Sequence, residues 1–254
     1  YDEEIGCVGV RSMIEMLQQA PIHPAMCIVG EPTHMAIATG HKGKTAIEAH
    51  CTGAEAHSAL APQAVTAIHI ACDLIAEIRR LQDELASHGA RDDAYDIPYT
   101  TLHAGIINAG VALNIVPNHA EVKFEIRNLA ADDPQAILNR LEQAMQPIIA
   151  AAQAKAPQAD LRFNITNAYP GLETGLDEDV VALVSSLTGH NDRIKVAFGT
   201  EAGLFTRDLG VPTVVCGPGS MAQGHKPDEY VSLDQLAACD AMLDALNARL
   251  VEGL

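Results

Sequence analysis

The stretch Val211-Pro212-Thr213-Val214-Val215-Cys216-Gly217-Pro218-Gly219 is a short apolar run that ends in a glycine-rich loop. Such a run is typical of a buried strand in an α/β sheet. A second run of this kind, Met26-Cys27-Ile28-Val29, is followed by Gly30-Glu31-Pro32-Thr33. Ligands collect at the carboxyl ends of strands in open α/β sheets. We therefore expect Glu31 and the loop after Cys216 to lie at one functional edge of a sheet.

The loop after Cys216 continues into Gly224-His225-Lys226-Pro227-Asp228-Glu229-Tyr230, and the chain opens with Tyr1-Asp2-Glu3-Glu4-Ile5-Gly6. Adjacent glutamates alone usually lie on a solvated face. Two glutamates and a histidine that converge at strand ends, however, form an oxygen- and nitrogen-rich set that suits zinc. Glu4, Glu31 and His225 are therefore candidate ligands, which leaves Glu3 as a base.

Composition excludes several classes of function. The 254 residues carry a formal net charge of −17, and no Lys/Arg cluster is present to bind a phosphate backbone, so we expect no nucleic-acid partner. No run approaches the ~18 apolar residues of a membrane span, and no signal peptide is visible. The six cysteines form no Cys-x-x-Cys pair and indicate reduced core residues of a cytoplasmic protein.

The middle of the chain alternates strands and helices in the order βαββαβ, which is that of a ferredoxin-like module. Val122, Phe124 and Ile126 are expected to face one way from one of these strands. The strands are expected at residues 45–49, 100–107, 111–127 and 161–165, and the helices at 65–85 and 137–152. We place this module at residues 44–168.

An α/β pattern surrounds the module, over residues 1–43 and 169–254. Helices are expected at 8–17 and 179–187, with a strand at 194–198 between the second helix and Gly199-Thr200-Glu201. The last helix opens with Ser232 and Gln235, a capping-box spacing, and its buried face is expected to hold Leu236, Leu243, Leu246 and Leu250. The fold class is thus α/β, a discontinuous catalytic domain interrupted by an inserted α+β module.

Six motifs in order along the chain resemble the di-zinc amidohydrolase and metallopeptidase family. They are Asp2-Glu3-Glu4, Gly30-Glu31-Pro32-Thr33, Ala56-His57-Ser58, Asn114-Ile115-Val116-Pro117, Arg127 and the His225 loop. The resemblance implies a zinc-binding catalytic domain with an inserted dimerisation domain, hence a homodimer. It also implies two Zn²⁺ ions per active site in the complete protein, with Co²⁺ as a possible substitute.

The resemblance also implies roles for particular residues. Glu4 and His225 would ligate one zinc ion, Glu31 would ligate the other, and Glu3 would act as general base. His57 would enter the active site of the partner subunit and stabilise the tetrahedral oxyanion.

Further residues are assigned to substrate binding. Asn114 and Arg127 resemble the pair that holds the substrate carboxylate, although Arg127 could instead pair with Glu121 or Glu125 across strands. Four more residues would shape the pocket through backbone amides, namely Thr200, Glu201, Gly217 and Gly219.

The implied reaction is hydrolysis of a small N-acyl amino acid by a zinc-activated water. The expected substrate is N2-acetyl-L-ornithine, in arginine biosynthesis. Aminoacylase or succinyl-diaminopimelate desuccinylase activity is the alternative within the family. The family's first motif, His-x-Asp, belongs upstream of Tyr1, so the chain is expected to be N-terminally truncated; without that motif, a non-catalytic dimerisation module is the alternative from another class.

Overall fold

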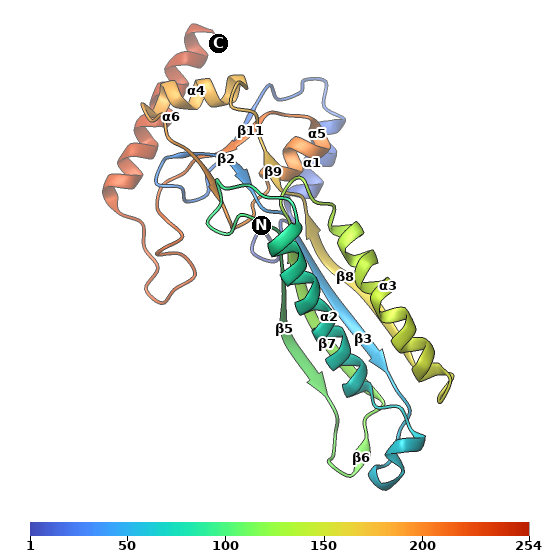
Figure 1. Ribbon diagram of the computed structural model, residues 1–254. Helices are drawn as coiled ribbons and strands as arrows, with labels where there is room; N and C mark the ends of the chain where they lie inside the picture. The colour runs from blue at the N-terminus through green and yellow to red at the C-terminus, as the bar shows by residue number, and fades with distance from the viewer. Residues whose placement is uncertain (254) are drawn as a thin grey trace. The chain divides into compact units, whose positions relative to one another are not determined.

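The computed structural model describes residues 1–253, which form two compact units (Figure 1). Unit 1 comprises Tyr1–Gly43, Asp93–Asp96 and the chain from Tyr169 onward. Unit 2 comprises Lys44–Asp92 and Ile97–Ala168. No helix in the described part of the chain is both long enough and apolar enough to cross a membrane.

Unit 1 is built on a mixed five-stranded sheet. Its strands are β1 (Cys27–Val29), β2 (Ile37–His41), β9 (Leu172–Glu173), β10 (Arg193–Val196) and β11 (Thr213–Val215). The order is β1-β11-β2-β10, with β9 paired to β2. β1 runs parallel to β11, and β2 runs parallel to β10 but antiparallel to β11 and β9. The predicted strands at β1, β10 and β11 are confirmed, whereas β2 and β9 were not foreseen.

Helices cover both faces of this sheet, because neighbouring residues of β1 point to opposite sides. Ile28 packs with the core under α4 (Asp179–Thr188) and α6 (Leu233–Glu252). Cys27 and Val29 pack with the core under α1 (Val10–Gln18) and α5 (Ala202–Leu209). Unit 1 is therefore a three-layer structure of the α/β class that the sequence predicted.

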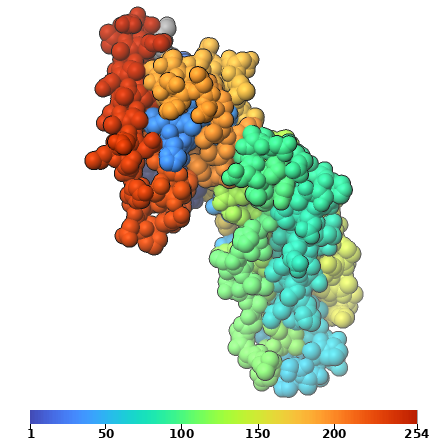
Figure 2. Space-filling model, turned by 60° about the vertical axis from the view of Figure 1, so that its left-hand side comes forward, coloured from blue at the N-terminus to red at the C-terminus, as the bar shows by residue number. Residues whose placement is uncertain are grey.

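The buried face of α6 differs from the prediction. Leu236, Leu243 and Leu250 are 40%, 45% and 55% exposed. The helix packs against the rest of unit 1 mainly through Met242 and Cys239. Residues spaced by seven drift by about 20° per repeat on a straight helix, so the leucines form a stripe beside the packed seam. Figure 2 draws α6 in red along one side of unit 1.

Unit 2 has the predicted ferredoxin-like order of elements. Its strands are β3 (Lys44–Thr52), β5 (Thr101–Ala109), β7 (His119–Arg127) and β8 (Asp160–Tyr169), and its helices are α2 (Ala67–His88) and α3 (Pro134–Gln153). The sheet order is β5-β7-β3-β8. β7 pairs antiparallel with both β3 and β5.

The helices of unit 2 pack on one face of this sheet. Val122, Phe124 and Ile126 of β7 are buried in a core that includes Leu74 of α2 and Leu141 of α3, which confirms their predicted common face. The alternate residues of β3 and β7 are only half-buried and form the open face of the sheet.

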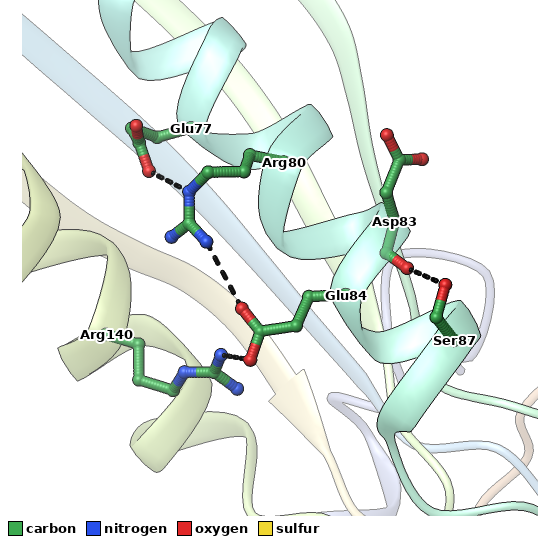
Figure 3. Close-up of polar contacts among 6 residues, drawn as sticks. All are labelled: Glu77, Arg80, Asp83, Glu84, Ser87 and Arg140. Atoms are coloured by element: carbon green, nitrogen blue, oxygen red, sulfur yellow. Dashed lines mark hydrogen bonds and ion pairs between the residues drawn. The ribbon is translucent and has the colours of Figure 1, made fainter.

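A polar network joins the outer surfaces of α2 and α3 (Figure 3). Glu84 accepts hydrogen bonds from Arg140 of α3 and, at 3.2 Å, from Arg80 one turn earlier on α2. Arg80 also donates to Glu77 at 2.7 Å. Exposed pairs of this kind contribute little stability individually, about 0.3–0.5 kcal/mol for i,i+4 pairs. The packing of α2 against α3 therefore depends mainly on their shared apolar core.

The region between β3 and α2, where no helix or strand was predicted, contains short regular elements. β4 (Ala56–His57) pairs with β6 (Ile115–Val116), and a 3₁₀ helix, η1 (Ser58–Gln63), follows β4. β6 also interrupts the single strand predicted over residues 111–127. Together these elements form one end of unit 2, which we call the tip.

Tyr95 lies within the segment Asp93–Asp96, which folds with unit 1 although the chain on either side belongs to unit 2. The Tyr95 ring is almost fully buried, with the ammonium groups of Lys42 and Lys195 at 5.7 and 5.6 Å from its centroid. Cation–π contacts of this geometry are attractive, so the ring anchors the segment.

Candidate metal centre

The carboxyl ends of β1 and β11 lie next to one another. The two strands run parallel with Val29 opposite Val215, so Glu31 and Gly217 each follow two residues after the paired ends. A Cβ on Gly217 would lie 2.1 Å from the carbonyl oxygen of Gly30. Only glycine permits so close an approach, and the Glu31 and Gly217 loops are therefore in direct backbone contact, as the strand-end argument predicted.

Glu3 and Glu4 lie in a tight turn at the start of unit 1. The Glu3 carbonyl accepts hydrogen bonds from the N–H groups of Gly6 and Cys7, both at 2.8 Å, and φ is positive at Gly6 and Cys7. The turn buries Cys7, whose Sγ lies 3.5 Å from Oε1 of Glu3. The side chain of Glu3 is thereby held inward, whereas Glu4 is 77% exposed.

His225 reaches the same region from the loop after β11. Nε2 of His225 lies 3.4 Å from Oε2 of Glu4. Its backbone N–H donates to Glu229 at 2.9 Å, and its φ of 57° is left-handed. The structure therefore brings two of the predicted ligands, Glu4 and His225, into contact.

Several carboxylates lie close together in this region and raise one another's pKa. Burial raises the pKa of Glu31 to about 7, and the negative charges of Glu3, Glu201 and Glu4 add to the shift. Burial also raises the pKa of Glu3, with further contributions from Glu201 and Glu4, while the hydrogen bond from Cys7 opposes them. The proximity of His225 opposes both pKa shifts. Four carboxylates with a single imidazole form a site that divalent cations would stabilise.

The donor set fits zinc, which binds imidazole nitrogen and carboxylate oxygen. Glu4 with His225 could hold one ion and Glu31 a second. A tighter group lies beside them, because Glu3, Cys7 and Glu201 each offer one donor atom within 4.8 Å of the others. Burial raises the pKa of the Cys7 thiol far above its usual value. The thiol therefore stays neutral and donates a hydrogen bond to Glu3.

His57 and Asn114 lie together at the tip of unit 2. His57 pairs with Ile115 across β4 and β6, and the Asn114 carbonyl accepts a hydrogen bond from Ser58 N–H at 2.9 Å. Nδ1 of His57 accepts the N–H of Ala59 at 3.2 Å. A neutral imidazole that accepts at Nδ1 carries its proton on Nε2, so exposed His57 presents an N–H donor.

Arg127 lies at the other end of β7 from the tip. Its guanidinium contacts Glu125 of the same strand at 3.1 Å. Eight residue steps separate Arg127 from His119 at the tip end of β7, which corresponds to about 27 Å of antiparallel strand. Within one chain, Arg127 and Asn114 therefore do not meet.

The remaining predicted residues surround the start of α5 and the Gly217 loop. Thr200 is fully buried, and its hydroxyl oxygen accepts the N–H of Ala202 at 3.0 Å, a bond that spans Glu201 at the start of α5. Gly219 has a φ of +84° and donates its N–H to the Gln235 side chain at 3.1 Å. Ser232 caps α6 as expected, but Gln235 bonds the Gly219 loop instead of completing a capping box.

Two residues near the centre were not singled out from the sequence, Cys7 and Thr33. Cys7 was taken as a core cysteine, and its contact with Glu3 depends on left-handed backbone at Gly6 and Cys7 that no periodicity reveals. Thr33 was noted only as a letter of the Gly-Glu-Pro-Thr motif. The sequence signal that could have identified them is the short spacing of Cys7 from Glu3 and of Thr33 from Glu31.

Comparisons with known proteins cover nearly the whole chain. Residues 39–152 match the family described as a peptidase dimerisation domain. An acetylornithine deacetylase from Myxococcus xanthus is 29% identical over 242 residues, 95% of this chain and 61% of that protein. Another from Vibrio atlanticus is 32% identical over 249 residues, 97% of this chain and 61% of that protein. The chain thus spans less than two thirds of the length of these relatives.

Solved structures show the same fold at lower identity. Aminopeptidase PepT from Bacillus cereus superposes with a TM-score of 0.72 at 20% identity, covering 96% of this chain and 61% of that one. An M20 family metallo-carboxypeptidase from Sulfolobus solfataricus gives 0.68 at 17% identity, covering 96% and 67%. The two-unit architecture is therefore that of known metallopeptidases.

Proposed function

Because the chain carries a peptidase dimerisation domain and is related along nearly all of its length to acetylornithine deacetylases, we propose that it hydrolyses N-acyl amino acids with two zinc ions. The proposed substrate is N2-acetyl-L-ornithine, whose acetyl group is removed as acetate. The six free cysteines agree with a reducing cytoplasm.

One observation carries this proposal, the clustering of Glu3, Glu4, Glu31 and Glu201 in unit 1, with His225 in contact with Glu4. The carboxyl of Glu31 has its pKa raised to about 7 by burial and by its acidic neighbours. A cluster of structural ion pairs would instead place a cation beside each carboxylate and so lower its pKa. The crowded carboxylates are therefore typical of a site that binds divalent cations.

The residues of the chain then have distinct tasks. When bound, the zinc ions supply Lewis-acid activation of a water molecule and of the amide carbonyl. Glu3 would accept the proton of that water and pass it to the departing amine, a task that suits a carboxyl whose pKa is raised by burial. Glu31, Glu4 and His225 would hold the ions, and Glu201 adds negative charge beside Glu3 and Glu31.

The proposed active site uses two subunits. His57 presents an Nε2–H donor at the tip of unit 2, which is suited to an oxyanion. Asn114 lies at the same tip, whereas Arg127 lies about 27 Å away along the sheet. If Asn114 and Arg127 hold one substrate carboxylate, they must come from different chains. A homodimer through unit 2 would meet that requirement.

Comparison of substrates tests the proposal. The full-length protein, loaded with Zn²⁺ or Co²⁺, is assayed for amine release from N2-acetylornithine, N-succinyl-diaminopimelate and N-acetylmethionine. We expect the highest kcat/KM for acetylornithine. A preference for one of the other substrates would keep the amidohydrolase chemistry and replace the substrate. Absence of hydrolysis with all three, in protein shown to contain two metal ions, would refute the enzymatic function.

A further inference from the structure

Thr33 is 6% exposed and lies two residues after Glu31, where the Glu31 loop meets the Gly217 loop. Its backbone N–H donates to the Gly217 carbonyl at 3.1 Å. Its hydroxyl donates to the Ala36 carbonyl at 2.7 Å and accepts the Gly217 N–H at 3.2 Å. One threonine therefore bonds both backbone groups of Gly217 and closes its own turn.

Backbone hydrogen bonds extend this contact on both sides. His34 N–H donates to the Gly219 carbonyl at 2.7 Å, and Met35 N–H donates to the Gly217 carbonyl at 3.0 Å. His34 and Met35 both have left-handed φ values, 55° and 62°. Non-glycine residues adopt this conformation only when the surroundings impose it. The turn after Thr33 is thus held in shape by its bonds to the Gly217 loop.

The contact is also close to His225 along the chain. Thr33 forms an antiparallel bridge with Ser220. The Ser220 carbonyl accepts hydrogen bonds from Gln223 and Gly224, at 2.9 and 3.3 Å. A single tight turn therefore separates the bridge from His225. Displacement of Ser220 relative to Thr33 would displace His225 relative to Glu31.

We propose that Thr33 is a positioning residue whose hydroxyl fixes the spacing between the Glu31 loop and the His225 loop. The inference rests on the proposed function, because that function makes Glu31 and His225 ligands of two neighbouring metal ions. Paired ions in hydrolytic sites lie only about 3.5–4 Å apart. Both ligands lie on loops, so their spacing must come from contacts between the loops rather than from a helix or strand.

Substitution by valine isolates the hydroxyl, because valine keeps the branched shape of threonine. Thr33→Val leaves the Gly217 N–H and the Ala36 carbonyl without their partner while the backbone bonds can persist. Thr33→Ser keeps the hydroxyl and loses only a methyl group. Thr100 of unit 2 is a matched control: it is also buried, and its hydroxyl also donates once, to Asp132, and accepts once, from Leu129 N–H.

The first readout needs no metal. Amide hydrogen exchange is measured over residues 31–36 and 217–225 in the wild type and in Thr33→Val, Thr33→Ser and Thr100→Val. Loss of the two buried hydrogen bonds should speed exchange about tenfold in both segments of Thr33→Val. Thr33→Ser should stay within a few-fold of the wild type, and Thr100→Val should leave both segments unchanged.

The second readout is titration with Co²⁺, followed by its visible absorption. Thr33→Val should bind Co²⁺ at least about tenfold more weakly and with an altered spectrum, whereas Thr33→Ser and Thr100→Val should match the wild type. Thr33→Ala provides a second hydroxyl-free variant with the same expected result if valine prevents folding.

The outcomes separate this inference from the proposed function. Wild-type exchange over 217–225 in Thr33→Val, or a serine variant as impaired as the valine variant, would overturn the role of the hydroxyl. If the wild type itself bound no Co²⁺, the proposed metal centre would fail, and the exchange data alone would decide whether Thr33 couples the loops.

Discussion

Acidification should destabilise unit 1 through His41, the last residue of β2. The ring is fully buried, Nδ1 contacts the Lys42 carbonyl at 3.0 Å, and Nε2 has no hydrogen-bond partner among the described residues. Protonation would place a charged N–H without an acceptor in the core. Burial accordingly lowers the pKa of His41 to about 4, with the bond to Lys42 opposing the shift.

The size of the effect follows from the two pKa values of His41. Unfolded His41 titrates near 6.5 and the folded residue near 4, a difference of about 2.5 pKa units. At 1.36 kcal/mol per pKa unit this amounts to about 3 kcal/mol. Between pH 6.5 and 4 the unfolded state binds the proton and the folded state does not, so stability falls as the pH falls. The contribution of neutral His41 to the free energy of unfolding is complete above pH 6.5, and about 2 kcal/mol of it should be lost by pH 5.

The assay compares the wild type with His41→Gln, whose side chain is neutral at every pH. Because two units need not unfold together, amide hydrogen exchange of the β2 peptide reports the stability of unit 1. Between pH 7.5 and 5 the wild type should lose about 2 kcal/mol more than the variant. Parallel curves for the two proteins over this range would refute the reasoning.

Three further predictions concern the candidate site. Glu3→Gln should retain two metal ions while the rate falls at least ~10²-fold, whereas His225→Ala should release metal, both measured by metal analysis beside activity. Gly217→Ala should lower metal affinity, because its Cβ would meet the Gly30 carbonyl; wild-type Co²⁺ binding in this variant would contradict the close contact. Mixed Glu3→Gln and His57→Ala subunits should recover about a quarter of wild-type activity, because half of randomly exchanged dimers gain one intact site. No recovery despite proven exchange would exclude a donated His57.

The sequence was most informative where an apolar run ends in glycine. β1 and β11 were predicted from such runs, and their loops meet because parallel neighbours end at the same edge. β2 was missed because Ile37-Ala38-Thr39-Gly40-His41 has only one large apolar residue, although it is fully buried. Its burial comes from the sheet around it and from the helices on both faces, because Ile37 packs with α4 and Ala38 with Ala202 of α5. This is tertiary context that no local pattern records.

Side-chain direction was harder to foresee than the elements themselves. The leucine spacing of α6 predicted one buried face, but the helix packs through Met242 and Cys239 beside the leucine stripe. The contact of Cys7 with Glu3 likewise depends on local backbone geometry. Asn114 and Arg127 were predicted to act together, and only the sheet showed that the length of β7 separates them within one chain.

The parallel pairing of β1 with β11 has a consequence for how the protein is made. Cys27 and Thr213 are partners, and all of unit 2 is synthesised between them. Closing so long a loop is costly in entropy and slow. Folding of unit 2 shortens this loop, because β3 and β8 are neighbours in the sheet and the Thr166 hydroxyl donates to the Ala46 carbonyl. We therefore expect unit 2 to fold first on the ribosome, and the ligand loops to meet only once β11 and the His225 loop have followed it.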